Sequence, residues 1–508
     1  MFVKVNSGAV IGVDGYMVAV EADISSGLPV FDIVGLPDSA VKESKERVRT
    51  AIKNTGFEFP VKRITVNLAP ADVRKSGPSF DLPMAVCVLV YENRIPVEAV
   101  ANAFFVGELS LEGSVRSVGG VLPMVISAKA AGITEIFVPF ENAQEAALVH
   151  GVTVYPVETI AHLVSHFSEQ PIPPLTVDLL NIFGKTKTES DVDFADVSGQ
   201  QLVKRALTIA AAGYHNALMI GPPGAGKTML ARRMPTILPD LSLDESMEIT
   251  KIYSIAGQLN QKNILMTQRP FRTPHHTASF MSLTGGGRIP TPGEITLAHN
   301  GVLFLDELPE FQKKALETLR QPMEDGHVTV TRVGGVCTYP SVFLLLAAMN
   351  PCPCGYMGSS RCKCSDHDTA RYLEKISGPL LDRIDIHIEA IPVDYHELSS
   401  PERFQEDSQT IKARVEAARV RQQHRFQNDA TRFNAKMSAK QIKKYCQLTS
   451  DADALIKQVF ENLNLSARAY HKILKISRTI ADLDDQDIIN IEHVSEAISY
   501  RSLDRKYW

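Results

Sequence analysis

The sequence of 508 residues has no long hydrophobic run, no excess of basic residues and no cysteine framework of the secreted kind. No apolar stretch approaches the ~18 to 20 residues that cross a bilayer. The strongest, VFLLLAAM at residues 342–349, has the length of a buried strand. The first residues lack a basic leader followed by a long apolar core, so no export is expected. We therefore expect a cytoplasmic protein without a membrane partner.

The formal net charge is −5, and charged residues make up 22% of the chain. Contact with nucleic acid must then come from a localised basic surface, such as a pore or a groove, and not from bulk attraction. Hydrophobic residues make up 44%, which is ordinary for a globular protein and argues against long disorder. A chain of this length exceeds one ordinary core and predicts about three domains.

The pattern of the chain changes at three points. Residues 1–165 alternate short β-rich runs with helical patterns, which predicts an α+β domain. Residues 166–192 are rich in proline and polar residues and are typical of a linker. Strand–loop–helix units recur over residues 193–394, and residues 395–508 are helix-forming to the end. The predicted fold is therefore α/β, with a central parallel sheet and a C-terminal helical domain.

The segment GPPGAGKT at residues 221–228 fits the spacing G-x-x-x-x-G-K-[ST]. The strand-like ALMI precedes it and the helical TMLARRM follows it, which is the context such a loop requires. Small residues let backbone N–H groups close around phosphates, while Lys227 meets the γ side and Thr228 the Mg²⁺. The predicted nucleotide-binding residues are Gly221, Pro222, Pro223, Gly224, Ala225, Gly226, Lys227 and Thr228.

Four further segments carry candidate residues for hydrolysis. GVLFLDE ends in two acids, of which Asp306 is expected to hold the hydrated Mg²⁺ and Glu307 to polarise the attacking water. LLLAAMNP ends in Asn350, whose amide would contact the γ-phosphate or the lytic water. Arg383 in SGPLLDRIDI is a candidate arginine finger supplied by a neighbouring subunit, with a surface salt bridge as the alternative. Arg468 begins an amphipathic helix and is a candidate lid arginine.

Together these segments resemble an AAA+ ATPase with both sensors and a finger. The stretches RPFRTPHHTASFMSLTGGGRIPTPGEITLAHNGVLFLDELPEF and LRQPMEDGHVTVTR resemble the magnesium-chelatase-like branch, and NPCPCG, SGPLLDRIDIH and SARAYHKILKISRTIADL resemble its ComM/YifB family. The resemblance runs essentially from end to end. It implies an ATP- and Mg²⁺-dependent homo-hexameric ring. It also implies a branch-migration helicase that moves single-stranded or branched DNA and aids integration of single strands during natural transformation, with other recombination or competence proteins as partners.

Two turn-rich, β-prone segments, residues 284–295 and 327–340, precede the acidic strand and the Asn350 strand. In a ring they would project into the central channel as hairpins. Arg288 and Arg332 are then candidates for phosphate contacts, and ordinary surface hairpins are the alternative. A basic run could likewise line a DNA path or form a solvated helix face: Lys412, Arg414, Arg419, Arg421 and Arg425.

Four of the seven cysteines, Cys352, Cys354, Cys362 and Cys364, form two C-x-C pairs. Four thiolates can close a tetrahedral structural Zn²⁺ site, with His367 as a spare ligand and free thiols as the alternative. The adjacent pair His275 and His276 is a poor metal pair, because neighbouring side chains point in different directions. For that pair we expect a structural role or a role in communication between subunits.

The N-terminal segments KSGPSFDLPMAVCVL and VRSVGGVLPMVISAKAAGITEIFVP resemble the proteolytic domain of Lon, which has a ribosomal S5 domain 2-like fold. Ser79 matches the nucleophile, but Leu122 stands where the family's lysine is expected. Lys129 lies about two helical turns further on, too far to replace it. Without a general base Ser79 is a poor nucleophile, so we expect a Lon-like domain kept for assembly or DNA handling.

The alternatives to a DNA motor are therefore a chelatase-type subunit that drives metal insertion into a tetrapyrrole, and an ATP-dependent Lon-like protease. The extra N-terminal domain and the cysteine cluster count against the first, and Leu122 counts against the second.

Overall fold

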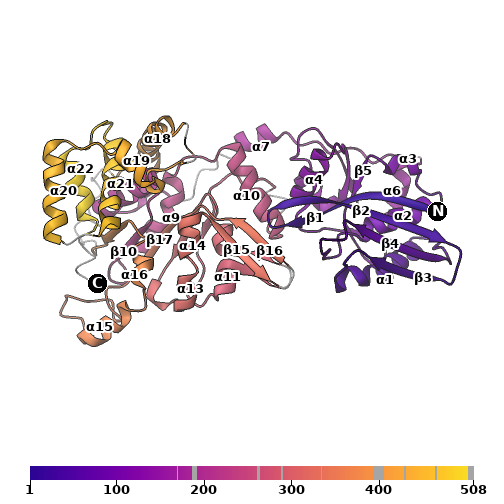
Figure 1. Cartoon of the computed structure of the whole chain (residues 1–508), viewed down its shortest axis with the longest axis horizontal. Helices are drawn as coiled ribbons and strands as arrows, with labels where there is room; N and C mark the ends of the chain where they lie inside the picture. Colours follow the sequence, from indigo (N-terminus) through magenta and orange to yellow (C-terminus); the bar gives the residue numbers. More distant parts are fainter. Residues whose placement is uncertain are drawn as a thin grey trace.

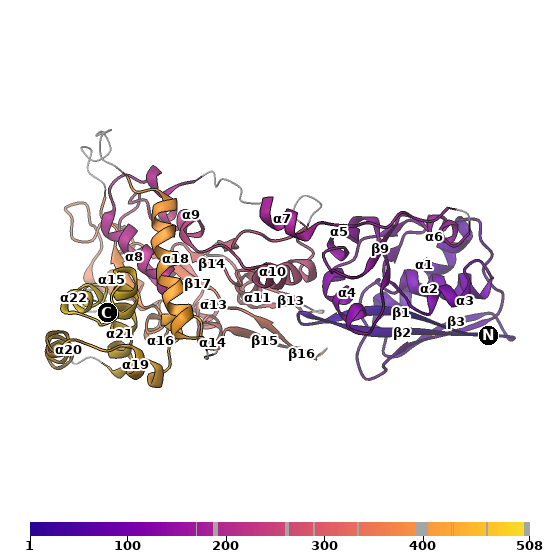
Figure 2. The same ribbon diagram turned by 90° about the horizontal axis from the view of Figure 1, so that it is seen from above.

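The computed structural model describes residues 1–168, 170–185, 192–259, 264–287, 290–332, 335–392, 405–427, 429, 431–463 and 466–501. The molecule is elongated (Figures 1 and 2). The N-terminal domain occupies one end, the C-terminal helices lie at the other, and a parallel sheet lies between them. None of the helices in these described ranges is both long and apolar enough to cross a membrane.

The N-terminal domain is built on seven strands: β1 (Phe2–Ile11), β2 (Asp14–Ser25), β3 (Val30–Val34), β4 (Arg63–Ala69), β5 (Ala103–Phe105), β8 (Glu135–Pro139) and β9 (Thr153–Val157). They form one mixed sheet in the order β3-β4-β2-β1-β5-β8-β9. Buried and more exposed residues alternate along β4, as in a sheet with one face on the core. The two-stranded ribbon β6 (Glu108–Leu109) and β7 (Val115–Arg116) stands apart.

The helices of this domain cover one face of the sheet (Figure 2). Helix α2 (Asp81–Tyr91) is buried on almost every side, which explains its continuous apolar sequence DLPMAVCVLVY. The set comprises α1 (Ser39–Asn54), α2 (Asp81–Tyr91), α3 (Val97–Val100), α4 (Val121–Ala130), α5 (Ala143–Ala146) and α6 (Ile160–His166), with α7 (Leu179–Lys185) beyond them.

The central sheet consists of β10 (Ala217–Ile220), β11 (Phe271–Arg272), β14 (Val302–Leu305), β17 (Leu344–Met349) and β18 (Ile386–Glu389). Its order is β11-β14-β17-β10-β18, and every pairing is parallel. β10, β14 and β17 are buried at every residue, because helices cover both faces of such a sheet. The carboxyl ends of these three strands therefore meet at one edge.

Two of the helices around this sheet, α9 (Lys227–Ile237) and α10 (Leu243–Ile255), have well-defined N-termini. Gly226 enters α9 in a left-handed conformation, and Ser242 with Glu245 forms a capping box on α10. The set comprises α8 (Gln201–Gly213), α9 (Lys227–Ile237), α10 (Leu243–Ile255), α11 (Phe280–Thr284), α12 (Glu294–Leu297), α13 (Lys313–Glu317), α14 (Arg320–Asp325), α15 (Asp366–Leu373) and α16 (Gly378–Leu381).

Both predicted hairpins are confirmed as antiparallel pairs. The first joins β12 (Gly285–Gly286) to β13 (Thr291–Pro292), and the second joins β15 (His327–Arg332) to β16 (Gly335–Pro340). The second points toward the N-terminal domain (Figure 1). There a Cβ added to Gly12 would lie 3.1 Å from the carbonyl oxygen of Thr338, so hairpin and domain are in close contact.

The C-terminal region is helical: α18 (Ser408–Arg425), α19 (Ala439–Tyr445), α20 (Ser450–Leu463), α21 (Ala467–Leu483) and α22 (Ile491–Ser499). Apolar residues of α18, α21 and α22 join those of α8 and α9 in one hydrophobic cluster. These helices therefore share a core with one face of the central sheet.

Candidate active site

The phosphate loop joins the carboxyl end of β10 to the start of α9. Gly224 and Gly226 have φ values of 81° and 79°, which side chains with a Cβ disfavour. The Lys227 ammonium donates to the carbonyl oxygens of Gly221 at 2.7 Å and Pro222 at 2.9 Å. Burial lowers the pKa of Lys227, against the opposing effect of nearby Asp306. The Lys227 ammonium therefore lies within the phosphate loop, at the place where the loop would bind phosphate oxygens.

The magnesium candidates meet across two neighbouring elements. The Thr228 hydroxyl donates to Asp306 Oδ2 at 2.6 Å, which joins the start of α9 to the end of β14. A hydroxyl and a carboxylate in contact form the kind of hard-oxygen pair that Mg²⁺ shares with nucleotide phosphates. These residues fit the ion that the sequence motifs imply.

Glu307 follows Asp306 in a strained conformation. Its φ of 53° places it in the left-handed region, which is uncommon for a residue with a Cβ. Its carboxylate lies 3.0 Å from Nδ1 of His276, and the ring of His275 lies 4.1 Å from that of His276. His276, with His275 packed against it, therefore contacts the candidate water-polarising acid Glu307. The sequence pattern alone had not indicated this contact.

Asn350 completes the set within one chain. It follows β17, the neighbour of β10, and its Oδ1 accepts a hydrogen bond from Lys227 Nζ at 3.2 Å. The structure thus brings Lys227, Thr228, Asp306 and Asn350 together at one edge of the sheet, with Glu307 adjoining.

The two candidate arginines lie at a different place. Arg383 precedes β18, and its carbonyl accepts a hydrogen bond from Asn216 Nδ2 at 3.0 Å, just before β10 begins. Since β10 and β18 are parallel, this is the amino end of the sheet. The Arg383 guanidinium pairs with Glu324 at the end of α14. Arg468 lies 3.9 Å from Asp382, so both arginines belong to one region.

A buried polar network fixes this region to the C-terminal helices. His215 Nδ1 lies 3.1 Å from Asp385 Oδ2, and its Nε2 lies 2.8 Å from Thr479 Oγ1 on α21. Burial would raise the pKa of Asp385, but the hydrogen bond to His215 and the charge of Lys472 outweigh it and lower the pKa. The backbone beside Arg383 is therefore held by an ionised, buried carboxylate.

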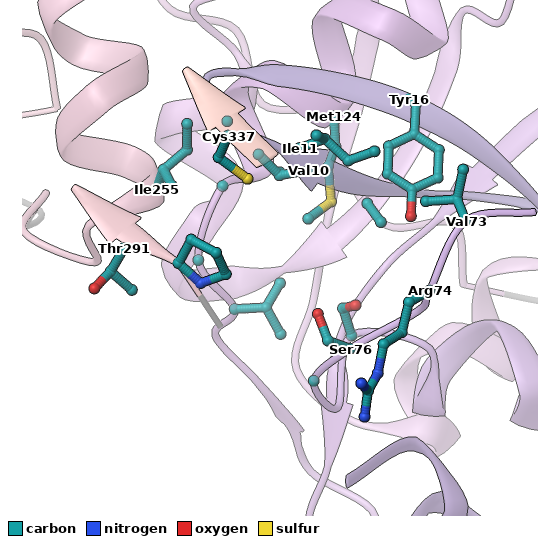
Figure 3. A pocket seen from close by; sticks show the side chains of 18 of the residues that line it. Val10, Ile11, Tyr16, Val73, Arg74, Ser76, Met124, Ile255, Thr291 and Cys337 are labelled. Carbon is teal, nitrogen blue, oxygen red and sulfur yellow. The ribbon is translucent and has the colours of Figure 1, made fainter. Parts of the chain in front are cut away.

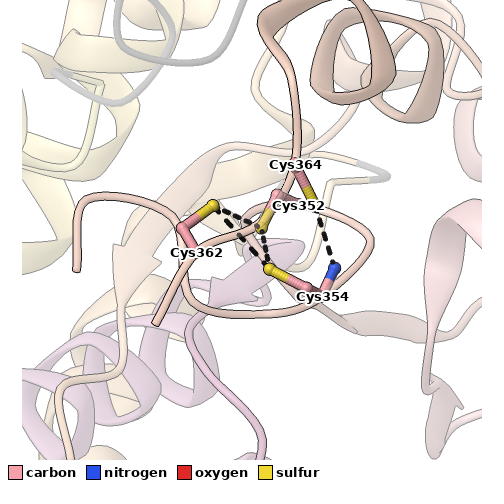
Figure 4. Close-up of side chains that lie close together, drawn as sticks. All are labelled: Cys352, Cys354, Cys362 and Cys364. Carbon is pink, nitrogen blue, oxygen red and sulfur yellow. Dashed lines mark hydrogen bonds between the residues drawn. The ribbon is translucent and has the colours of Figure 1, made fainter. Parts of the chain in front are cut away.

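The four cysteines of the C-x-C pairs lie together after Asn350 (Figure 4). Their sulfur atoms lie within 4.8 Å of one another, and in the described ranges no other group of three or more His, Cys, Asp or Glu meets that criterion. Neither His367 nor the His275–His276 pair belongs to it. This cluster has the composition and the spacing of a site for one metal ion.

A cavity of 610 Å³ lies where the N-terminal domain meets the second hairpin (Figure 3). Cys337 of β16 and Val10 and Ile11 of β1 line it, and Ser79 contributes to its wall. The Ser79 hydroxyl has no hydrogen-bond partner in the residues that the structure describes. The buried amine of Lys75, four residues earlier, donates to the Val73 carbonyl at 2.7 Å.

Leu122 and Lys129, the other two residues considered in the resemblance to Lon, both lie in α4. Leu122 is fully buried in α4, and its backbone N–H donates to Glu145 at 2.8 Å. Lys129 lies exposed near the end of α4, next to Gly151. Glu145 also accepts a hydrogen bond from Ser254 of α10, which joins the two domains.

The DNA candidates are only partly described. Arg288 lies outside the described residues, and Arg332 is the last residue of β15. The basic run of α18 is engaged within the chain, since its members pair with Asp240, Glu406, Asp485, Asp487 and Asp482, and one stacks on Phe433. The residues concerned are Lys412, Arg414, Arg419, Arg421 and Arg425. It therefore offers little uncompensated positive charge.

The five-stranded parallel sheet, the phosphate loop after its β10 strand and the acids after its β14 strand define a nucleotide-hydrolysing enzyme of the AAA+ class. Family models agree. Residues 193–398 match magnesium chelatase, subunit ChlI, residues 20–142 match subunit ChlI of Mg-chelatase, and residues 405–501 match magnesium chelatase, subunit ChlI C-terminal.

Close relatives cover nearly the whole chain. Competence protein ComM of Haemophilus influenzae is 42% identical over 507 residues, which is 99% of this chain and 97% of the relative. The uncharacterized protein YifB of Escherichia coli has the same identity and coverage. Lon protease 2 of Bacillus subtilis is 30% identical over 135 residues, 26% of this chain and 24% of its own. The chain therefore belongs to the ComM/YifB family of magnesium-chelatase-like AAA+ ATPases.

The sequence shows that Arg383 lies between two acids, Asp382 and Asp385, but it did not indicate their partners, nor that Glu324 pairs with Arg383. Each is an ordinary acid in the sequence, and only the fold reveals its partner. The role of His276 as partner of Glu307 was likewise hidden, because the two residues are 31 positions apart.

Proposed function

We propose that the protein is an ATP-hydrolysing motor that works as a homo-hexameric ring on single-stranded or branched DNA. In this proposal it acts as a branch-migration helicase that helps single strands integrate during natural transformation or recombination. ATP and Mg²⁺ bind at the phosphate loop, with Thr228 and Asp306 at the metal. Other competence or recombination proteins are its natural partners.

The observation that carries the ring is the position of Arg383 relative to the phosphate loop. The loop follows the carboxyl end of β10, whereas Arg383 lies beside Asn216 at the amino end of the same strand. Four extended residues span roughly 13 Å. Arg383 is thus on the wrong side of the sheet for its own nucleotide and on a suitable side for that of a neighbour.

A split site of this kind requires a closed assembly for every site to be complete. A repeated head-to-tail interface closes into a ring when its rotation allows. An arginine supplied in trans contributes about 10³- to 10⁵-fold to turnover in nucleotide-hydrolysing enzymes. Arg468 pairs with Asp382, next to Arg383, so we assign it to the same neighbouring nucleotide.

DNA as the substrate is supported by the similarity to competence protein ComM, which is 42% identical over 99% of this chain. It is supported also by the placement of the hairpins. Both precede a strand of the central sheet, β14 or β17, and so lie toward the amino edge where Arg383 is found. Glu324, the partner of Arg383, is the second-last residue of α14, and β15 begins three residues later. A contact at the second hairpin is thereby linked to the neighbour's ATP site.

The N-terminal domain is assigned a role in assembly or DNA handling rather than peptide cleavage. A serine protease needs a base held against its hydroxyl. Leu122 cannot serve, and the amine of Lys75 is bonded to a backbone carbonyl. Labelling of Ser79 by a fluorophosphonate probe would contradict this assignment.

The proposal is tested by ATP hydrolysis of the full chain with no addition, with single-stranded DNA and with forked DNA, together with branch migration of a labelled junction. DNA should stimulate turnover, and the junction should be resolved only when ATP is hydrolysed. Stimulation by a tetrapyrrole-binding partner alone would favour a chelatase subunit. ATP-dependent loss of a protein substrate would favour a protease.

A further inference from the structure

The cysteine loop, residues 352–364, touches the phosphate loop directly. Gly355 has a φ of +84°, and a Cβ added there would lie 2.5 Å from Cδ of Pro223 and 3.7 Å from Cγ of Asn350. The proline ring is rigid and cannot move aside as a flexible side chain would. The first C-x-C turn therefore rests against both the phosphate loop and the residue that bonds Lys227.

Almost nothing apolar holds this loop in place. Cys352 and Gly355 are buried at its start, but none of residues 356–371 is buried, and the next buried residue is Tyr372 in α15. A segment of this length without buried side chains gains little hydrophobic stabilisation to offset its conformational entropy. Its order has to come from another source.

The sulfur atoms match the geometry of one tetrahedral metal. Zn–S bonds of about 2.3 Å place tetrahedral sulfurs about 3.8 Å apart. The sulfur of Cys352 lies 3.4 Å from that of Cys354 and 3.9 Å from that of Cys362, and Cys354 lies 3.7 Å from Cys362. The backbone N–H of Cys354 donates to the sulfur of Cys364 at 3.4 Å, as outer-shell donors do at metal thiolates (Figure 4).

We propose that the four cysteines bind one structural Zn²⁺ and that the zinc-closed loop braces the phosphate loop through the contact of Gly355 with Pro223. Zinc is preferred because four thiolates at these spacings enclose a single ion, while iron–sulfur clusters spread their thiolates around several metals. Four protein ligands leave no open position, so the ion has no part in the chemistry. Its role is to hold Pro223 and Asn350 in the arrangement that receives nucleotide.

Metal analysis of the purified full chain is the first measurement. The parental protein should carry one zinc ion per chain, and the C362S/C364S double variant should carry none. Cys337→Ser is the matched control, because Cys337 is a half-buried thiol outside the cluster, and it should retain the metal. A parental protein that takes up no zinc when zinc is supplied, or that carries iron instead, overturns the assignment.

The brace is tested by ATP turnover without DNA, so the result does not depend on the proposed motor activity. C362S/C364S should lose between about 10- and 100-fold in turnover, as small misplacements at a reacting centre do. Gly355→Ala should keep its zinc and show a similar loss, because all four thiols remain while the added Cβ presses on Pro223 and alanine disfavours the φ of +84°. Normal turnover in both variants overturns the brace.

Removing zinc from the parental protein distinguishes loss of the brace from misfolding caused by the substitutions. A chelator that strips zinc, followed by excess Mg²⁺, should lower turnover to the level of the double variant. Re-addition of zinc should restore it. Turnover that is unchanged when the zinc has left overturns the brace.

Discussion

In the proposed ring, replacing Glu324 with Gln tests how Arg383 is held before it reaches the nucleotide of a neighbour. The side chain of Arg383 is 14% exposed, and that of Glu324 is 55% exposed. Arg383 Nε is buried and has no hydrogen-bond partner in the described part of the chain. A second guanidinium nitrogen donates to the Pro379 carbonyl. The folded-back arrangement therefore satisfies the guanidinium only in part, and we interpret it as a resting position.

The size of the effect follows from the exposure of the pair. An ion pair with a half-exposed partner contributes about 0.5 to 1 kcal/mol. Removing that restraint should favour the extended side chain by the same amount, which is about two- to fivefold in rate. We expect Glu324→Gln to raise DNA-independent ATP turnover by this factor, measured at saturating ATP and at a protein concentration where rings form.

The control is Glu406→Gln, which removes the ion pair to Arg414, a more exposed arginine on a different part of the chain. Its turnover should match that of the parental protein. A loss of activity in Glu324→Gln as large as that of Arg383→Ala would refute the reasoning, because Glu324 would then orient the arginine for catalysis and not restrain it.

Three further predictions concern the acid at the nucleotide and the buried network. Glu307→Gln should retain nucleotide binding in a fluorescent-ATP titration but slow hydrolysis by about 10²- to 10⁴-fold. A loss of nucleotide affinity as large as the loss of hydrolysis rate would contradict the role assigned to Glu307. His215→Leu should lower the free energy of unfolding by about 2 to 3 kcal/mol, since the charged Asp385 loses a hydrogen bond. The lowered pKa of Asp385 gives stability that is present above the ordinary carboxyl value of 3.8 and is lost as the pH falls below it. Thermal melting of the parental protein should therefore fall more steeply below pH 4 than that of Asp385→Asn, and parallel slopes would contradict this.

The residues at the carboxyl ends of the strands could be predicted from the sequence because the pattern is local. A buried apolar run followed by Asp306 or Asn350 specifies both the strand and the edge at which its last side chain lies. The Gly-rich loop also demands its conformation, as the positive φ of Gly224 shows. Local periodicity and turn chemistry were sufficient there.

The contacts between distant segments could not be predicted in the same way. The pairing of Arg383 with Glu324 and the packing of Gly355 on Pro223 depend on how loops from different strands fold back on the sheet. An exposed acid and a glycine carry no pattern that names a partner. The packing of α18 on α8 is a further case. The buried positions of α18 include Arg419 and Gln422, so its sequence marks the buried face only weakly and does not show which element covers it.

Mixing two inactive variants tests most directly whether each ATP site is shared between neighbours. Lys227→Ala should bind no nucleotide but still offer its arginine, and Arg383→Ala should bind nucleotide but offer none. Each alone should hydrolyse ATP at least about 10³-fold more slowly than the parental protein. Mixed in equal amounts before rings form, they should recover about a quarter of parental turnover, since one interface in four combines an intact loop with an intact arginine. A mixture as inactive as its components, or an Arg383→Ala protein with parental turnover, would contradict the account.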